Sequence, residues 1–412
     1  RPTRPAITWL DARAGAETEE LTGRTGVRGW GLGGLAAALW VERHEPAVAA
    51  ATRWYLATWE FLAFRLSGVA AAPLVPDQLV PAVEGLAAAG IPVDKLPSPA
   101  AAGEVIGRLR PTMAAELGLE SGIPVVGGTV DAFASYHGAG LLEPGDAYDP
   151  GGAAGGFGVY WGSPVEAAGA FVTSAPLAGL YSVGAAMAAT GRSLDWFRDG
   201  IGPEVPIATL LAEAEATSPG ADGLVFLPYL AGERSPLWDP AARGVLAGLT
   251  LGHGRAHIAR AIVEASALAI RHVAQPMLAA GVAVREMRVC GGPARSDFWN
   301  QVKADVTGFP VAVPAVLETA VVGSAILGAV GVGAFPDVPS AIRAMTGIDH
   351  RLTPRTELVG LYDALFEAYV ALYPATAPIL RELAGATNRW ALDRPVDDRP
   401  AGPETPPAVA AR

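Results

Sequence analysis

The chain has 412 residues, a length that favours two domains rather than one. Hydrophobic residues make up 51% of it and charged residues 17%, so it can bury a sizeable core and is too apolar to be disordered as a whole. The formal net charge of -11 argues against nucleic acid as a partner, because phosphate contacts need clustered Lys and Arg.

Membrane insertion and disulfide bonding are also not expected. Every apolar run of about 18 residues is broken by polar residues or Gly, so the sequence predicts no membrane span. Cys290 is the single cysteine, which rules out a disulfide within the chain and fits the reducing cytoplasm.

The N-terminal half opens on a segment that is typical of an interior strand, at residues 5–9. Because the chain begins with Arg1 directly before this strand, we expect that the natural N-terminus is missing. The apolar spacing over residues 53–66 predicts an amphipathic helix that stops at Gly68. Residues 123–126 form a short apolar run before two glycines, which predicts a buried strand that leads into a loop.

The C-terminal half shows strands and helices in alternation, which favours an α/β fold. We expect helices at 257–280, 297–306 and 318–330, and strands at 157–161, 287–290 and 309–313. Pro276 is expected to kink or end the first helix, and Ser296 to cap the second. Domains are expected at 1–165 and 166–390, with a disordered tail at 391–412 that is rich in Pro and Ala.

An acidic residue, Asp131, follows the turn at Gly127 and Gly128. A carboxylate there can face a cleft and accept the proton of a substrate hydroxyl, which phosphoryl transfer to an alcohol requires. On these residues alone, an aspartate that only caps the following helix is the more frequent case.

Two glycine-rich turns are candidates for binding an anion. Residues 149–156 contain two glycine pairs, whose backbone N–H groups can converge on a phosphate. Residues 291–296 lie between a strand and a helix, where the helix N-terminus favours negative charge. Simple packing of glycine turns is the alternative for both, and glycine loops alone are weak evidence.

Two further clusters point to structure rather than chemistry. Glu233 and Arg234 are neighbours in a turn bounded by prolines, where an ion pair that shapes the loop is favoured over catalysis. His253 and His257 are four residues apart, but no third ligand of suitable spacing follows, so zinc is not expected.

In order along the chain, these segments resemble the FGGY carbohydrate kinases, a branch of the actin-like sugar kinases, and the xylulokinases in particular. The match runs over about residues 5–345 and rests on five segments taken together, at residues 5–13, 103–107 with 122–131, 228–236, 243–249 and 291–305. The resemblance implies two actin-like (ribonuclease H-like) α/β domains that close over ATP, Mg2+ and a sugar or polyol.

The resemblance also assigns roles to particular residues. It makes Asp131 the catalytic base and places Trp9 against the sugar. It places the nucleotide at the following residues: Gly152, Ala153, Gly191, Gly292 and Ser296. The ligands of the metal stay open, because the hairpin with an Asp-x-Gly-Thr motif, which opens the family's sequences, is absent here.

The expected function is therefore ATP-dependent phosphorylation of a sugar or polyol hydroxyl, with a ketopentose such as xylulose as the first choice. Glycerol, ribulose, fuculose or another polyol are alternatives. The family's phosphate loop reads Gly-Thr-Ser, whereas this chain has Ala153 and Ala154, so a sugar or nucleotide binder without catalysis is the competing interpretation. A small sugar or polyol is the expected partner, with a homodimer as the candidate assembly, in the cytoplasm and without nucleic acid or membrane.

Overall fold

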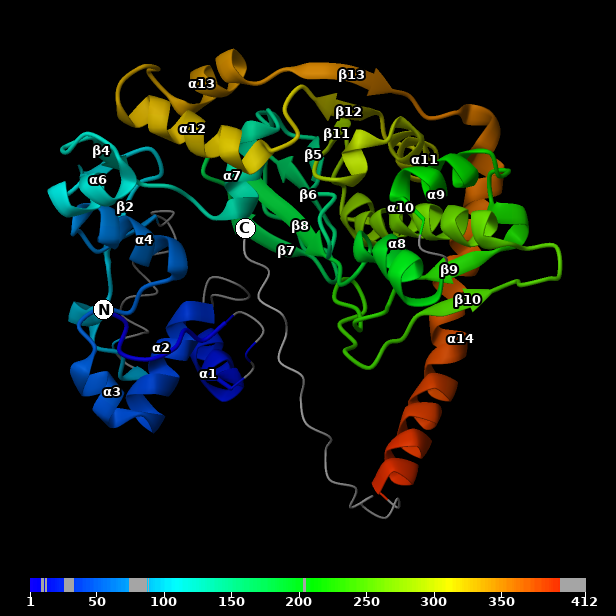
Figure 1. Ribbon diagram of the computed structural model, residues 1–412, viewed down its shortest axis with the longest axis horizontal. Coiled ribbons are helices and arrows are strands. Elements are labelled where there is room, and N and C mark those ends of the chain that lie inside the picture. The colour runs from blue at the N-terminus through cyan, green and yellow to red at the C-terminus, as the bar shows by residue number, and fades with distance from the viewer. Residues whose placement is uncertain are drawn as a thin grey trace, which may run out of the picture.

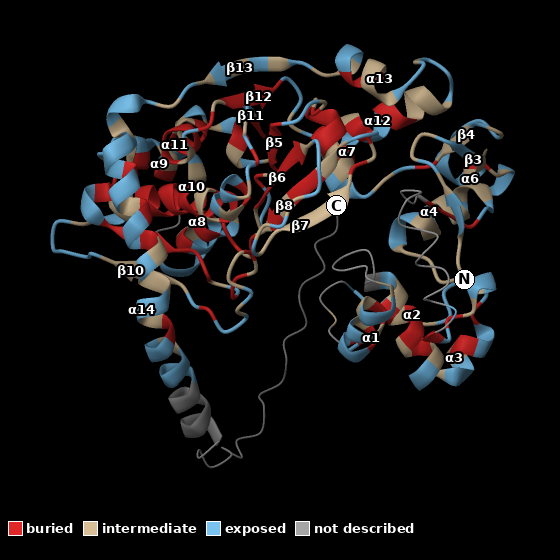
Figure 2. Cartoon of the chain, turned by 180° about the vertical axis from the view of Figure 1, so that it is seen from behind, coloured by how far each residue is buried: buried red, intermediate tan, exposed pale blue. Residues whose placement is uncertain are grey.

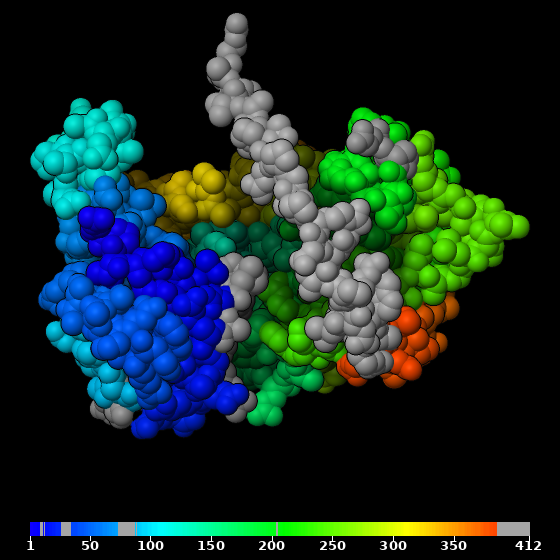
Figure 3. Space-filling view, turned by 60° about the horizontal axis from the view of Figure 1, so that its bottom comes forward, coloured from blue at the N-terminus to red at the C-terminus, as the bar shows by residue number. Residues whose placement is uncertain are grey.

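The computed structural model of the 412-residue chain describes residues 1–8, 11, 13–25, 33–73, 87, 89–202 and 205–392. These residues form an N-terminal part (residues 1–126) and a larger body (residues 131–392), which lie side by side (Figure 1). In the space-filling view the N-terminal part, in blue and cyan, occupies one side of the molecule, and the green-to-orange segments of the body occupy the other (Figure 3).

The N-terminal part consists of short helices and two pairs of strands. Its described helices are α1 (Gly15–Thr25), α2 (Gly33–His44), α3 (Pro46–Ala51), α4 (Thr58–Ser67) and α6 (Pro111–Leu117). Its strands are β1 (Ala71–Pro73), β2 (Ser98–Ala100), β3 (Val105–Arg108) and β4 (Pro124–Val126). The strands β1 and β2 pair in parallel, and β3 and β4 pair antiparallel.

Two expectations for the N-terminal part are wrong. Residues 5–8 are irregular, because no strand in the described chain pairs with them. The helix expected from residue 53 begins only at Thr58, where the Glu60 carboxylate accepts the backbone N–H of Ala57. It ends at Gly68 as predicted, but none of its residues is buried, and Trp59 and Leu62 expose 48% and 60% of their surface. The apolar spacing thus predicted that a helix forms here, but it did not predict how little of that helix is buried.

The body holds the remaining elements. Its helices are α7 (Asp131–Gly138), α8 (Arg192–Trp196), α9 (Ile207–Glu215), α10 (Arg255–Ala279), α11 (Asp297–Thr307), α12 (Thr319–Gly331), α13 (Val338–Met345) and α14 (Val359–Leu392). Its strands are β5 (Asp146–Asp149), β6 (Gly156–Trp161), β7 (Phe171–Ser174), β8 (Tyr181–Ala186), β9 (Val225–Leu227), β10 (Val245–Ala247), β11 (Glu286–Val289), β12 (Val311–Pro314) and β13 (Ile348–Leu352). Residues 393–412, most of the expected tail, lie outside the described residues.

Seven strands of the body form one sheet, in the order β13-β12-β11-β5-β6-β8-β7. The three strands β5, β11 and β12 are parallel, and β6 to β8 continue the sheet antiparallel on the other side of β5. The boundary expected at residue 165 falls inside this sheet, between β6 and β7. Because strands that share backbone hydrogen bonds belong to one unit, β5 and β6 go with the body.

The core of the molecule lies in the body, where buried residues gather on the sheet and on α10 and α11 (Figure 2). Helix α10 is largely buried, and it continues through Pro276 to end at Ala279. Helix α11 begins as predicted at Ser296, whose hydroxyl oxygen accepts the N–H of Trp299 at 3.3 Å, and it stops at the left-handed Gly308. Within the residues that the structure describes, every helix is too short or too polar to cross a lipid bilayer.

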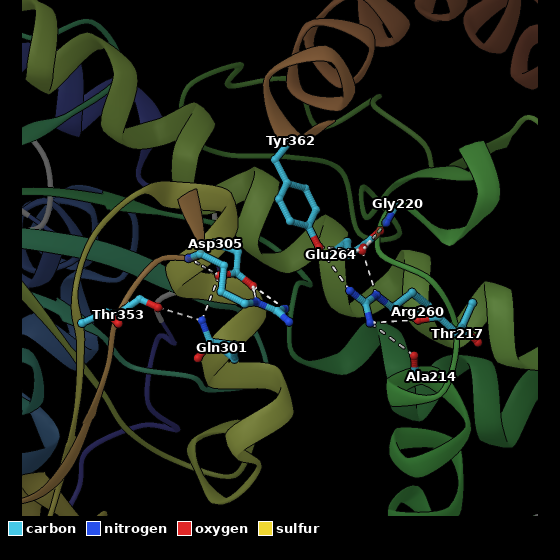
Figure 4. Close-up of polar contacts among 10 residues, drawn as sticks. Ala214, Thr217, Gly220, Arg260, Glu264, Gln301, Asp305, Thr353 and Tyr362 are labelled. Atoms are coloured by element: carbon cyan, nitrogen blue, oxygen red, sulfur yellow. Dashed lines mark hydrogen bonds and ion pairs between the residues drawn. The ribbon is translucent and has the colours of Figure 1, made fainter. Parts of the chain in front are cut away.

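A buried polar network joins α10 to α9 and α14 (Figure 4). The Arg260 guanidinium donates to the Glu264 carboxylate at 2.7 Å and to the Tyr362 hydroxyl at 3.2 Å. It also donates to the backbone carbonyls of Ala214 and Thr217. The charge of this arginine is therefore compensated within the core, as a buried ion pair requires.

Candidate active site

Two glycine-rich turns leave the same edge of the main sheet. Strands β5 and β11 are parallel neighbours with Asp149 opposite Val289, so the loops that follow them lie next to each other. A Cβ atom on Gly151 would come within 2.0 Å of the Cys290 carbonyl oxygen, and one on Gly291 within 2.8 Å of the Pro150 oxygen. Both glycines have positive φ angles, of 54° and 70°. Only glycine permits this approach of the two backbones.

A third segment, residues 187–192 after β8, closes on the same loop. The Thr190 N–H donates to the carbonyl of Ala154 at 3.2 Å, beside Ala153. Gly191 lies so near that a Cβ atom would meet the Gly152 oxygen at 2.2 Å. The structure therefore brings together three of the predicted nucleotide residues, Gly152, Ala153 and Gly191, from segments far apart in the sequence. We call this meeting of three backbone turns, residues 150–155, 187–192 and 290–296, the glycine edge.

Gly292 and Ser296, the other two residues predicted to contact the nucleotide, belong to the third of these turns. Gly292 has φ -57° and ψ -52°, and apart from its chain neighbours no atom lies within 4 Å of the place where its Cβ would be. Because Pro293 follows, this helical conformation is less favourable for a residue with a side chain than for glycine. The position that needs glycine for its backbone is its neighbour Gly291. Gly292 is therefore open on its outer side, and Ser296 uses its side chain to cap α11.

A buried ion pair, which the sequence did not suggest, holds the first turn of the glycine edge at the end of β5. The Lys303 ammonium of α11 lies 2.5 Å from the Asp149 carboxylate, and both side chains are almost fully buried. The other carboxylate oxygen of Asp149 accepts the Gly151 N–H at 2.9 Å. The signal for this pair was a lysine on the apolar face of a predicted helix, in a chain that has only one other lysine, Lys95.

The enclosed space at the glycine edge is small, at about 10 Å³, so a ligand would lie over it rather than inside it. It is lined by Gly151, Gly152, Thr190, Gly191, Pro293 and Lys303 among others. A larger cavity of about 320 Å³ lies between α9, α10, α11 and the end of β13. Both of its arginines already have partners. Arg260 pairs with Glu264 (Figure 4), and Arg355 pairs with Asp305.

Asp131 is the first residue of α7, where the chain passes from the N-terminal part into the body (Figure 1). Its carboxylate is exposed and accepts the N–H of Ala132 at 2.8 Å. The cap position belongs to Val130, which makes no side-chain cap. Asp131 is not among the residues that line the cavity at the glycine edge.

Helix α7 is held rigidly against α12 by close contact of their backbones. A Cβ atom on Gly138 would lie 1.8 Å from the Thr319 oxygen, and one on Gly323 would lie 1.8 Å from the Ala134 oxygen. The other end of α12 contacts the N-terminal part, since a Cβ atom on Gly331 would meet the Val126 side chain at 2.6 Å. The two helices therefore form the junction of the two parts, and Asp131 begins one of them.

Two further expectations concern the sugar and a metal. Trp9, the residue expected against the sugar, lies outside the described residues. In the part of the chain that the structure describes, no group of three or more His, Cys, Asp or Glu side chains could hold a metal ion. His253 and His257 stack edge to face, with ring centroids 5.2 Å apart, and the second contacts Asp222.

Comparison with known proteins identifies the family. A family model described as "FGGY family of carbohydrate kinases, C-terminal domain" matches residues 162–332. Xylulose kinase of Bacillus subtilis (strain 168) is 29% identical over 406 residues, which are 90% of this chain and 79% of that protein. Gluconokinase of Bacillus licheniformis is also 29% identical, over 90% of this chain and 78% of that protein.

A solved structure gives the same result. The crystal structure of xylulose kinase from Rhodospirillum rubrum superposes with a TM-score of 0.78 at 31% identity, over 92% of this chain and 81% of that one. The fold is thus the two-domain actin-like fold, although the N-terminal part described here contains only two small pairs of strands. The chain belongs to the FGGY family of carbohydrate kinases.

Proposed function

We propose that the protein transfers a phosphoryl group from ATP to a hydroxyl of a ketopentose such as xylulose. The observation that carries this proposal is the glycine edge, where three glycine-containing turns meet at the end of parallel strands. Backbone N–H groups in such turns bind phosphate groups. Two of the three similar proteins reported above are xylulose kinases, which favours xylulose over gluconate.

The proposed mechanism divides the work between the two parts of the site. The exposed Asp131 carboxylate accepts the proton of the sugar hydroxyl while that oxygen attacks the terminal phosphorus of ATP. The bond from this phosphorus to the bridging oxygen breaks, and ADP leaves. Gly152, Ala153 and Gly191 hold the phosphates through their backbone, and Gly292 lies against the adenosine. Rate acceleration in this chemistry comes mainly from position and charge stabilisation rather than from covalent steps.

Mg2+ fits this site as part of the nucleotide. It keeps several waters and usually binds through one or two carboxylates together with the substrate phosphates. Asp149 is committed to Lys303 and to the Gly151 N–H, so it offers little to a metal. Mg2+ would therefore be held chiefly by the phosphates and by water, and it would supply charge neutralisation on the phosphates.

A second candidate function is a sugar or nucleotide binder without catalysis. Ala153 and Ala154 favour it, because the phosphate loop carries no hydroxyl donors at these positions. The exposed Asp131 weighs against it, since a binder has no use for a base at that junction. Incubation with ATP-Mg and each of xylulose, ribulose, fuculose, gluconate and glycerol distinguishes the two functions. If none of these compounds is phosphorylated, the kinase proposal fails and the binder is favoured.

The nucleotide assignment predicts that Gly292→Val weakens ATP binding among the folded molecules. A Cβ atom at this position meets no atom within 4 Å apart from its chain neighbours, so the side chain points to where a ligand would lie. Some stability is also lost, because valine before Pro293 disfavours the helical backbone of this position. We expect the Kd for ATP-Mg to rise by about tenfold or more, which corresponds to about 1.4 kcal/mol. Calorimetric titration and thermal unfolding are measured on the same samples.

The matched control is Gly360→Val, another exposed glycine without atoms near its Cβ position, which lies in α14. It should leave the Kd unchanged. A parent protein that binds ATP at its site gains about 2.7 kcal/mol of stability at a hundredfold excess over Kd. If the two variants bind ATP-Mg with equal Kd values, Gly292 does not contact the nucleotide.

A further inference from the structure

The turn at residues 230–239 carries a buried carboxylate, and this carboxylate binds backbone rather than a side chain. One oxygen of Glu233 accepts the N–H of Ala188 at 2.8 Å and the N–H of Arg234 at 2.7 Å. Only 4% of Glu233 is exposed. The sequence favoured an ion pair with Arg234 that shapes the turn, whereas the carboxylate reaches across to the segment that follows β8.

Two neighbours of Glu233 bind the same segment. The Arg234 guanidinium donates to the carbonyl of Met187, and the Ser235 N–H donates to the carbonyl of Ala186 at 3.0 Å. Residues 233–235 thus hold the backbone of residues 186–188, directly after β8 ends. We call this set of contacts the clamp.

The clamped segment continues into the glycine edge. The Met187 N–H donates to the Gly155 carbonyl at 3.3 Å, and the Thr190 N–H and hydroxyl donate to the Ala154 carbonyl. Gly191 then lies against Gly152, at the closest approach of the two segments. One continuous run of backbone therefore leads from Ala188 to the surface where the phosphates are proposed to bind.

The position of Glu233 makes the clamp sensitive to charge. Burial raises the pKa of Glu233 to about 7, against the lowering effects of the Arg234 and Ala188 N–H groups and of the Arg234 charge. The other titratable groups that face it are Tyr229 and Tyr369, whose own pKa values are raised mainly by burial and further by Glu233. None of these tyrosines ionises near neutral pH, so Glu233 itself determines the response.

The direction of the response follows from the raised pKa. A carboxyl group with pKa near 7 when clamped and 4.5 when solvated binds its proton more tightly in the clamped state. Deprotonation therefore favours release of the clamp, and the equilibrium constant for opening rises with pH between these two values. From pH 6 to pH 8 the expected increase is about tenfold, because the constant rises about tenfold per pH unit up to the clamped pKa and levels off above it.

We propose that Glu233 is a positioning residue for the nucleotide, which holds residues 187–191 against the phosphate-binding loop through the Ala188 N–H. This inference rests on the proposed function for its nucleotide, but the clamp itself can be measured without one. Glu233 touches neither the phosphates nor the sugar in this arrangement. Its removal should therefore weaken nucleotide binding and leave the Kd of the sugar unchanged.

The test compares Glu233→Gln, which keeps an acceptor oxygen without charge, with Glu233→Leu, which has no acceptor. Hydrogen exchange of the Ala188 amide, corrected for the intrinsic pH dependence, reports clamp opening with no ligand present. We expect the wild type to lose about tenfold in protection between pH 6 and pH 8, the Gln variant to show no such loss, and the Leu variant to lose protection at every pH.

The nucleotide arm of the experiment measures the Kd of ATP-Mg and of xylulose for the same three proteins. The Leu variant should bind ATP about tenfold more weakly or worse, and the Gln variant should bind it nearly as the wild type does. Protection of Ala188 that is equal in wild type and Leu variant overturns the clamp. Lost protection with unchanged ATP affinity overturns the positioning role. A wild type that binds no ATP refutes the proposed function instead, and hydrogen exchange still decides about the clamp.

Discussion

Replacement of Asp131 by Asn is expected to lower kcat for sugar phosphorylation by about 10²–10⁴. The amide cannot accept the proton of the attacking hydroxyl, so the alcohol stays a poor nucleophile. The structure predicts little effect on folding, because the side chain is exposed and its hydrogen bond to the Ala132 N–H can be kept by the amide oxygen. Steady-state kinetics with ATP-Mg and xylulose measure the loss.

Glu120→Gln serves as the control for this experiment, since it also removes one exposed negative charge, in the loop after α6. It should leave kcat unchanged. Thermal unfolding and the Kd for ATP-Mg establish that the Asp131 variant is folded and still binds nucleotide. An Asp131→Asn protein with near-normal kcat would show that another group accepts the proton.

Replacement of Lys303 by Met is expected to lower the free energy of unfolding by about 3–5 kcal/mol. The ammonium is the buried partner of Asp149, and without it the carboxylate stays in the core with an uncompensated charge. Met has a similar shape, so the packing of the helix α11 is kept while the charge is removed. Urea denaturation at neutral pH measures the change.

Two matched variants isolate the charge from the packing. The only other lysine of the chain, Lys95, pairs with Glu42 at a site that water partly reaches, and Lys95→Met should therefore cost less than Lys303→Met. The double variant Lys303→Met with Asp149→Asn should recover much of the loss, because no buried charge is left alone. Equal losses for the two lysines would mean that the buried pair has no special weight.

Local features of this chain were predictable from neighbouring residues. The α11 helix begins at Ser296 because its hydroxyl oxygen reaches an N–H three residues ahead, and α4 ends at Gly68 because glycine accepts a left-handed backbone. The alternation of strands and helices over residues 257–330 likewise appeared where the periodicity placed it. Such signals depend only on a few consecutive residues, so the sequence carries them in full.

The tertiary structure decided which of these residues meet. It paired Asp149 with Lys303, turned Glu233 toward Ala188, and assigned the restricted backbone to Gly291 rather than Gly292. It also left Trp59 and Leu62 of α4 exposed and carried one sheet across the expected domain boundary.

The physical reason for this division is the range of the interactions involved. A helix cap or a glycine turn is a contact within one segment, and its free energy is set by residue types alone. Burial, charge compensation and the close approach of two backbones depend on the second segment, which the sheet order supplies. The sequence of this protein therefore determined where its turns and helices lie, and only the pairing of β5 with β11 and of β6 with β8 brought the turns that follow them together at the glycine edge.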